Sequence, residues 1–527
     1  KVRLVPGHAG FFPQLAVGGL FRGLAVVDPA LRHLPGRRGA VDALAREQLT
    51  VYGAALGLVA AGHPVTADAA AAMLGAGGNA WDAAVAAGFA ATAAEPLYTS
   101  LAGGGFLLAT GPGRAPVLFD FFTAVPGLGR VRPVAPPVAV PIAFGAATQT
   151  FHVGPGSVAV PGLLPGLLEV HGLLGSLPLA QVVRPAIEAA GLGQSAAPMV
   201  RVVSLLAPVM ARSSTGAALY LRDGRPLGVN DHFHNPRQAA VLAEIAAGDR
   251  NGFSDDELGG AVTSADLDDY RVEARTPLSL DLTGEGGWTN PAPAFGGRLV
   301  ALGLQRLLAD RRGSDRRVPD GAVALADAMV AQAEARSRLV GAVQGTTHLS
   351  VIDRWGNVAS MTASNGSGSG EFIPGTGIQL NNMMGEEDLH PAGFEAAEPG
   401  SRIPSMMAPT ALALHGGDRV MALGSGGSER IRSTIMQVAA DLVAGRLTPA
   451  EAVEAPRMHW DGSSLQVEPG MPIEVLAALE ERYRVVEWDH QDLYFGGLHL
   501  VATPNVAVGD QRRDGVARVV APADRGQ

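Results

Sequence analysis

Cysteine is absent from this 527-residue sequence, which excludes disulfides, thiolate catalysis and metal sites built on cysteine. Charged residues are scarce, at 17% of the chain, yet hydrophobic residues reach 47%, so the composition is that of a folded protein. The formal net charge of −10 argues against a general nucleic-acid-binding protein. No run of about 18 or more apolar residues is free of charges and helix breakers, so we expect no membrane-spanning helix.

Residues 1–50 carry no long periodic pattern, and we interpret them as an N-terminal extension of unknown role. The first residues loosely resemble a signal peptide. Pro6 and Pro13 interrupt their apolar part, however, and no small-residue cleavage motif follows. We therefore favour a cytoplasmic location over a periplasmic or secreted one.

Regular secondary structure is expected from residue 54 onward. Residues 65–94 are rich in alanine and predict two helices, with Thr66 as the N-cap of the first and Asn79 as the N-cap of the second. Buried strands are expected over 101–111 and 115–122.

The rest of the chain alternates between helical and extended regions. Residues 162–260 are mostly helical in pattern, for example 235–248. We expect further helices at 298–312, 321–340, 429–444 and 448–455, and strands at 347–353, 358–363, 377–380, 409–414, 419–423, 464–468 and 498–503. Helices, a sheet, a second sheet and more helices predict a sandwich of stacked layers.

The two strands after Gly345 form a predicted hairpin around the loop 354–357. A strict register over this four-residue loop places Thr346 opposite Asn365 and Thr347 opposite Ser364. A one-residue slip or a bulge would instead bring Ser364 to the face of Thr346. Polar residues gather at the end of the ladder in either register. The simpler interpretation is that threonine and serine merely suit a strand.

Thr346 would be a self-sufficient nucleophile if it were the first residue of a chain. Its α-amine, with an ordinary pKa of about 7.7–8.0, could then serve as the base for its own hydroxyl. Such a chain requires cleavage of the bond between Gly345 and Thr346. The small Gly345 allows the threonine hydroxyl to approach the preceding carbonyl.

Eight segments in collinear order resemble the γ-glutamyltransferase family, within the N-terminal nucleophile hydrolases. The segment “GTTHLSVIDRWGNVASMT” at 345–362 resembles the nucleophile region of that family. The other segments lie at 60–90, 95–108, 154–162, 263–278, 374–384, 401–410 and 424–431, so the resemblance spans about residues 55–510. It implies an α+β fold, a four-layer αββα sandwich.

The resemblance also implies a precursor that cleaves itself before the nucleophile. Thr346 would begin a small subunit, 346–527, and residues 51–345 would form the large-subunit part of the same αββα domain. Thr346 would be the nucleophile of both self-cleavage and catalysis. Ser364 occupies the position of a second family threonine that supports it. Gly426 and Gly427 match the family's oxyanion hole, and the alternative for this pair is a tight turn before a helix.

Several substrate-binding positions depart from the family pattern. Phe122 stands where the family has an arginine that holds the substrate α-carboxylate, and phenylalanine cannot make that charged contact. Met406 replaces one of two family serines, whereas Ser405 is kept. Glu386 stands in place of an aspartate. The predicted substrate-binding residues are Asn365, Asn382, Glu386, Ser405, Met406 and Phe122.

The function implied is hydrolysis or transfer of an acyl amide whose acyl group differs from that of glutathione. The partners implied are a small acyl-amide or peptide-like substrate and the two subunits of one precursor, with further oligomerisation left open. No cofactor and no metal are expected. The alternative is an unprocessed, non-catalytic homologue that acts as a binding protein. The missing arginine and the short segment 321–344 before the nucleophile favour that alternative.

Other candidate sites are weaker. The segment “DHFHNP” at 231–236 has metal-ligating residue types, but one such cluster in a loop is weak evidence for a metal. His348 lies on the face of Thr346, and we favour a structural role for it over that of a general base. Arg430 and Arg432 are interpreted as surface or subunit contacts, with recognition of an acidic substrate as the alternative.

Overall fold

The computed structural model describes residues 3–4, 55–130, 134–144, 147–249, 252–337, 345–386, 389–390, 393–394 and 396–522. Nearly all of the extension predicted for residues 1–50 lies outside these residues. So does the end of the helix expected over 321–340.

The larger of two central sheets carries the hairpin that begins at Thr346. Its eight strands are, in spatial order, β1 (Arg3–Leu4), β11 (Glu273–Arg275), β4 (Arg114–Phe121), β3 (Gly104–Gly111), β15 (Val358–Ser364), β14 (Thr346–Asp353), β2 (Gly57–Ala61) and β23 (Val516–Val520). All neighbouring pairs are antiparallel except β1 and β11. The nucleophile strand β14 therefore lies inside the sheet, with a partner on each side.

The second sheet packs face to face against the first. Its strands are, in order, β12 (Leu278–Leu282), β13 (Glu285–Thr289), β16 (Thr410–Leu414), β17 (Arg419–Gly426), β21 (Gly497–Ala502) and β22 (Val506–Val508). Strand β17 lies against β14 and β15, so the end of β17 at Gly426 approaches the start of β14.

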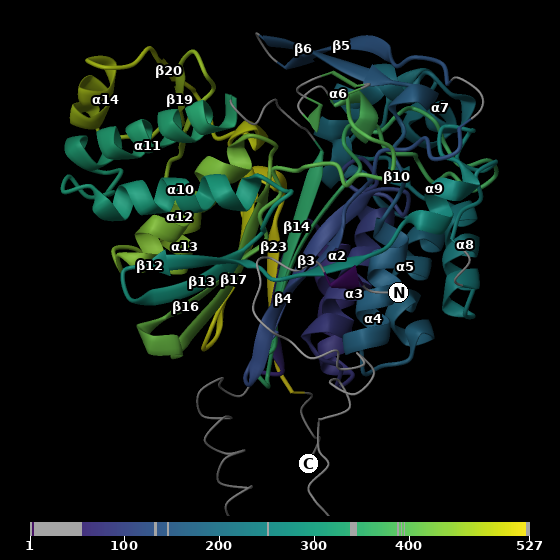
Figure 1. Ribbon diagram of the computed structural model, residues 1–527, viewed down its shortest axis with the longest axis horizontal. Coiled ribbons are helices and arrows are strands. Elements are labelled where there is room, and N and C mark those ends of the chain that lie inside the picture. The colour runs from purple at the N-terminus through teal and green to yellow at the C-terminus, as the bar shows by residue number, and fades with distance from the viewer. Residues whose placement is uncertain are drawn as a thin grey trace, which may run out of the picture.

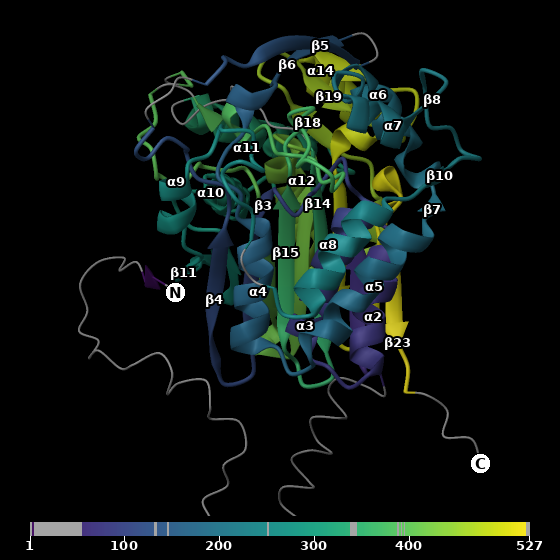
Figure 2. The same cartoon turned by 90° about the vertical axis from the view of Figure 1, so that its right-hand side faces the viewer.

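Helices cover the outer face of each sheet, as Figures 1 and 2 show. The first sheet is covered by α2 (Pro64–Gly75), α3 (Ala80–Ala94) and α4 (Leu163–Leu174), with α5 (Leu179–Leu192) and α8 (Pro236–Ala246) packed outside them. The second is covered by α10 (Gly296–Ala309), α12 (Arg430–Val443) and α13 (Pro449–Glu454), with α11 (Pro319–Ser337) and α14 (Ile473–Glu480) packed outside them. The predicted four-layer αββα sandwich is confirmed.

Smaller elements surround the sandwich. They are α6 (Val200–Met210), α7 (Ser214–Tyr220), α9 (Ser264–Asp269), the hairpins β5–β6 (Val138–Phe144, Ala147–Val153) and β8–β9 (Leu221–Arg222, Arg225–Pro226), the pair β7–β10 (Gln194–Ser195, His232–Phe233), and β18–β20 (Met458–Trp460, Leu465–Val467, Val485–Glu487). The strand expected over 377–380 is present only as isolated bridges at Gln379 and Leu380. Among the described residues, no helix is both long and apolar enough to cross a membrane.

Alternation along the strands separates two cores. In β2, Val59 and Ala61 face the helices α2 and α3, whereas Leu58 and Ala60 face the second sheet. The same rule in β14 sends Leu349 and Val351 to the helices and Ile352 to the second sheet. Thr346, six residues before Ile352, therefore belongs to the face between the two sheets.

The two alanine-rich helices begin differently from one another. Asn79 caps α3 as predicted, because its Oδ1 accepts from the backbone N–H of Trp81 and Asp82. The prediction of Thr66 as the N-cap of α2 is wrong. The cap is His63, and Thr66 lies inside the helix, where its hydroxyl donates to Glu95 at 2.6 Å.

The hairpin register is shifted by one residue from the strict prediction. Thr346 pairs with Ser364, and the ladder continues to Ile352 and Val358. The backbone N–H of Asp353 donates to the carbonyl of Asn357, so the loop contains three residues, 354–356, one fewer than predicted. The Asp353 carboxylate holds this loop by accepting from the backbone N–H of Trp355 and Asn357. The slipped register, the alternative allowed by the sequence, is the one observed.

Candidate active site

Thr346 is the first residue of β14 and lies directly across from Ser364. Its Oγ1 is 3.5 Å from Ser364 Oγ, at the limit of a hydrogen bond. Ser364 Oγ in turn donates to the carbonyl oxygen of Gly345 and accepts from the backbone N–H of Gly366 at 3.1 Å. Two hydroxyls are therefore gathered around the peptide bond that precedes Thr346.

Gly345 has a backbone conformation that a side chain would not permit. Its φ is +79°, and a Cβ atom would lie 1.7 Å from the carbonyl oxygen of Gly366. The close approach holds Gly345 against the loop that follows Ser364. The glycine before the nucleophile is thus required by the local geometry.

Replacing Ser364 with alanine is expected to slow cleavage after Gly345 by about 100-fold. The reason is that the carbonyl of Gly345 would lose its hydroxyl donor, and loss of one donor to a developing oxyanion costs about 10²–10³ in rate. The measurement is the rate at which full-length protein disappears on a denaturing gel. Ser364→Thr, which keeps the hydroxyl, is the control and should cleave within a few-fold of the parent. Equal rates for Ser364→Ala and the parent would contradict the assigned contact.

The glycine pair at the end of β17 lies beside Thr346. A Cβ atom on Gly426 would be 2.2 Å from the Thr346 carbonyl oxygen, and Gly427 has a φ of +117°. Helix α12 begins three residues later, at Arg430, so its N-terminal partial positive charge is directed at this turn. The arrangement suits an oxyanion hole, and that role for Gly426 and Gly427 stays a prediction.

Arg513 is a site residue that the sequence did not reveal. Its Nη1 donates to the carbonyl oxygen of Thr346 at 3.4 Å, and Nε and Nη2 donate to Leu493 O at 3.3 and 3.2 Å. The guanidinium lies 5.6 Å from the ring centre of Tyr98. Burial lowers the pKa of Arg513 from its ordinary value. The Arg513 side chain thus holds the backbone carbonyl of Thr346 in place.

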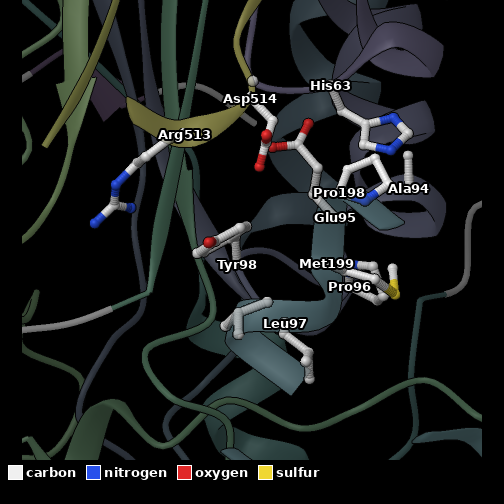
Figure 3. A pocket seen from close by; sticks show the side chains of 12 residues that line it. His63, Ala94, Glu95, Pro96, Leu97, Tyr98, Pro198, Met199, Arg513 and Asp514 are labelled. Atoms are coloured by element: carbon white, nitrogen blue, oxygen red, sulfur yellow. The ribbon is translucent and has the colours of Figure 1, made fainter. Parts of the chain in front are cut away.

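A pocket behind β14 is lined in part by Glu95, Tyr98, Arg513 and Asp514 (Figure 3). The carboxylates of Glu95 and Asp514 point toward each other, whereas the guanidinium of Arg513 points away from them. Glu95 accepts from Thr347 Oγ1 at 2.5 Å, and burial raises its pKa. Thr347 is thus engaged on the helix side of the sheet and is turned away from Thr346.

A small cavity in front of Thr346 brings together five of the predicted site residues. Its lining residues are Phe122, Thr346, Ser364, Ser405, Met406, Met407, Ser428 and Ile431. The sequence predicted five of these. It missed Met407, Ser428 and Ile431, since a methionine and an isoleucine in apolar segments have the pattern of ordinary core residues.

Asn365, Asn382 and Glu386 lie outside the lining of this cavity. Asn382 Oδ1 and Glu386 Oε1 accept from the backbone N–H of Ser367 at 2.8 and 3.1 Å, so both hold the loop 366–370. Asn365 is fully buried, and its side-chain amide has no hydrogen-bond partner within the described residues. Substrate binding by these three residues stays a prediction.

Glu386→Gln is expected to raise the thermal stability of the protein at pH 8 and to leave it nearly unchanged at pH 4. Burial raises the pKa of Glu386 to about 7 from an unfolded value of 4.5. Because the pKa of Glu386 is higher in the folded than in the unfolded protein, its carboxyl group does not destabilise the fold below pH 4.5. The free energy of unfolding then decreases as the pH rises toward and through 7. The loss at pH 8 is at most about 3 kcal/mol, because one pKa unit is worth about 1.4 kcal/mol. Melting temperatures of both proteins at the two pH values test this. A gain of equal size at both would contradict it.

His348 is fully buried between the sheets. Its Nδ1 is 2.8 Å from Thr362 Oγ1 and its Nε2 is 2.9 Å from Ser350 Oγ. Burial lowers the pKa of His348 well below its ordinary value. Both ring nitrogens are therefore engaged away from the Thr346 hydroxyl, which supports a structural role.

Two weaker candidates also have definite positions. The interpretation of Arg432 as a surface residue is wrong, because its side chain is buried beside Glu429 and Trp460. Arg430 stacks on Tyr494, with 4.6 Å between guanidinium carbon and ring centre. In the segment 231–236, Asp231 accepts from the backbone of Gly228. Within the described part of the chain, no group of three or more potential metal ligands occurs.

Comparison with known proteins identifies the class of this site. Residues 66–343 and 332–520 match the gamma-glutamyltranspeptidase family. The chain therefore belongs to that family, as the sequence segments indicated. It is by class an N-terminal nucleophile enzyme that acts on acyl-amide bonds.

Its relatives include both acylases and glutathione hydrolases. An acylase ACY 1 proenzyme from Pseudomonas sp. (strain SE83) is 33% identical over 507 residues, covering 85% of this chain and 89% of that protein. A glutathione hydrolase proenzyme from Bacillus subtilis (strain 168) is 27% identical over 506 residues, covering 80% and 84%. The structure of a cephalosporin acylase from Bacillus halodurans superposes with a TM-score of 0.71 at 25% identity, covering 88% of this chain and 96% of that one.

Proposed function

We propose that the chain cleaves itself between Gly345 and Thr346 and then uses Thr346 to hydrolyse or transfer the acyl group of an amide. The products of cleavage are a large chain ending at Gly345, with its layered part at 51–345, and a small chain, 346–527. The observation that carries the proposal is the contact of Ser364 Oγ with both Thr346 Oγ1 and the carbonyl oxygen of Gly345.

Self-cleavage begins when Thr346 Oγ1 attacks the carbonyl carbon of Gly345. Ser364 Oγ donates to the carbonyl oxygen as negative charge develops there. The Gly345–Thr346 C–N bond breaks, the hydroxyl proton passes to the leaving nitrogen, and an ester joins Gly345 to the side chain of Thr346. Water then hydrolyses the ester, which leaves a carboxylate on Gly345 and a free α-amine on Thr346.

Catalysis repeats the same attack on a substrate amide. The α-amine of Thr346 accepts the proton of its own hydroxyl, the hydroxyl oxygen bonds to the acyl carbon, and the backbone N–H groups of Gly426 and Gly427 stabilise the oxyanion. The amine then gives the proton to the leaving nitrogen. Water or another amine releases the acyl group from Thr346 by the reverse sequence.

The acyl group is proposed to differ from γ-glutamyl. Phe122 lines the cavity at the position where the family resemblance expects an arginine for the substrate carboxylate. The relative at 33% identity is an acylase and a solved neighbour is a cephalosporin acylase, which supports an acylase-like activity for this chain.

The test is a time course of the purified protein on a denaturing gel. The 54.0 kDa chain is expected to be replaced by two bands. A single band at full length after long incubation would contradict self-cleavage and favour the alternative of a non-catalytic binding protein.

A further inference from the structure

The cavity in front of Thr346 is lined by two kinds of side chain. Hydroxyls come from Thr346, Ser364, Ser405 and Ser428, and apolar surface comes from Phe122, Met406, Met407 and Ile431. None of these lining residues carries a charge. An ionised group that entered the cavity would lose its hydrating water and contact only hydroxyls and apolar surface. Burial of a charge without an opposite charge is strongly unfavourable.

Phe122 is fixed in the wall of the cavity. Its ring stacks on Phe106 with 5.5 Å between ring centres, and both rings are buried. Its backbone carbonyl accepts from the hydroxyl of Tyr270 at 2.7 Å and from the guanidinium of Arg402. Rotating Phe122 aside would break the aromatic contact, so the apolar wall is a permanent feature.

Two cations near the cavity, Arg402 and Arg513, are already committed to other groups. Arg402, behind Phe122, lies 3.4 Å from the Asp120 carboxylate and is stacked on Tyr270. Arg513 donates to the backbone carbonyls of Thr346 and Leu493. Each guanidinium thus donates to the backbone carbonyl of a lining residue, Arg402 to Phe122 and Arg513 to Thr346. An acyl carboxylate in the cavity would find neither guanidinium available.

The cavity is also small. The space in it that can hold a group the size of a water molecule is about 10 Å³, about what one water molecule needs. An acyl chain that enters must therefore move the flexible methionine side chains of the wall, which favours a short chain.

We propose that the acyl group taken by this site is short, uncharged and apolar, with pentanoyl as a representative. The inference rests on the proposed function, since it describes the acyl half of the substrate of Thr346. Phe122, Met406, Met407 and Ile431 are the residues that set this specificity.

The experiment compares three p-nitroanilides of matched length: pentanoyl, glutaryl and γ-glutamyl. Glutaryl replaces the terminal methyl of pentanoyl by a carboxylate, and γ-glutamyl adds an α-amine to glutaryl. The pentanoyl substrate is expected to have a kcat/KM about 100-fold or more above the other two, because only its chain end is uncharged. Equal or faster turnover of glutaryl or γ-glutamyl, abolished in Thr346→Ala, would overturn the acyl assignment and leave the proposed function intact. Self-cleaved protein that turns over none of the three would overturn both.

A second measurement changes the cavity itself. Met407→Ala enlarges it and is expected to raise the ratio of octanoyl to pentanoyl turnover at least about 10-fold, since a single methylene in an apolar pocket is worth that much. Met73→Ala is the matched control, because Met73 is equally buried but lies in α2, outside the cavity. It should leave the order of chain lengths unchanged. An unchanged ratio in a Met407→Ala protein that still cleaves itself would contradict the assigned wall.

Discussion

Thr346→Ala is expected to abolish self-cleavage and amide hydrolysis together. The substitution removes the hydroxyl that begins β14 and contacts Ser364, so neither the Gly345 carbonyl nor a substrate carbonyl has a nucleophile. The protein should stay a single 54.0 kDa chain, and its turnover of any acyl p-nitroanilide should fall to background. The measurements are a denaturing gel over several days and initial rates by absorbance.

Two neighbouring variants make this result specific to the nucleophile. Thr346→Ser keeps a hydroxyl and is expected to cleave, although more slowly. Thr347→Ala removes the adjacent threonine, whose hydroxyl contacts Glu95 on the opposite face, and it should still cleave. If the Thr346→Ala protein separates into the same two chains as the parent, another residue is the nucleophile.

Gly426→Ala is expected to reduce self-cleavage and catalysis by at least about 100-fold. A methyl group at this position would lie 2.2 Å from the carbonyl oxygen of Thr346, which is backbone and cannot turn aside. Either β14 or the turn before α12 must shift, and the two N–H groups proposed to bind the oxyanion would lose their alignment. Loss of one such donor alone costs about 10²–10³ in rate. Cleavage kinetics on a gel and kcat on the pentanoyl substrate measure the effect.

The control for this variant is Gly75→Ala at the end of α2. A Cβ atom there meets nothing within 4 Å, and the φ of Gly75 is not in the left-handed region. Its cleavage rate and melting temperature should match those of the parent. Parent-like amide hydrolysis by the Gly426→Ala protein would show that the glycine pair is only a turn, the alternative that the sequence left open.

Local sequence patterns predicted most of the helices and strands that build the fold. The alternation after Gly345 predicted β14 and β15, and the alanine-rich run before Glu95 predicted the helices α2 and α3, because alternation is typical of a strand and alanine has the highest helix propensity. The register was harder to predict. It depends on the Asp353 carboxylate holding Trp355 and Asn357 in a tighter loop, a side-chain contact that spacing does not reveal.

The parts of the site that escaped prediction are contacts between distant segments. Arg513 reaches Thr346 from 167 residues away, and Glu95 meets Thr347 across 252 residues. No periodicity links such pairs, since only the packing of the two sheets and α3 brings them together. Part of the cavity wall was not predicted for another reason. Met407 and Ile431 are buried apolar residues, and only geometry distinguishes a cavity wall from the core.

The most direct test of Thr346 as the nucleophile is intact mass spectrometry of the protein after rapid quenching during turnover of the pentanoyl anilide. We expect two chains. The small chain has Thr346 at its N-terminus, and a fraction of it is heavier by one pentanoyl group. Peptide mapping should place the added group on Thr346. A two-chain protein that turns over substrate with the acyl group on any other residue would contradict the central claim, as would turnover by an uncleaved chain.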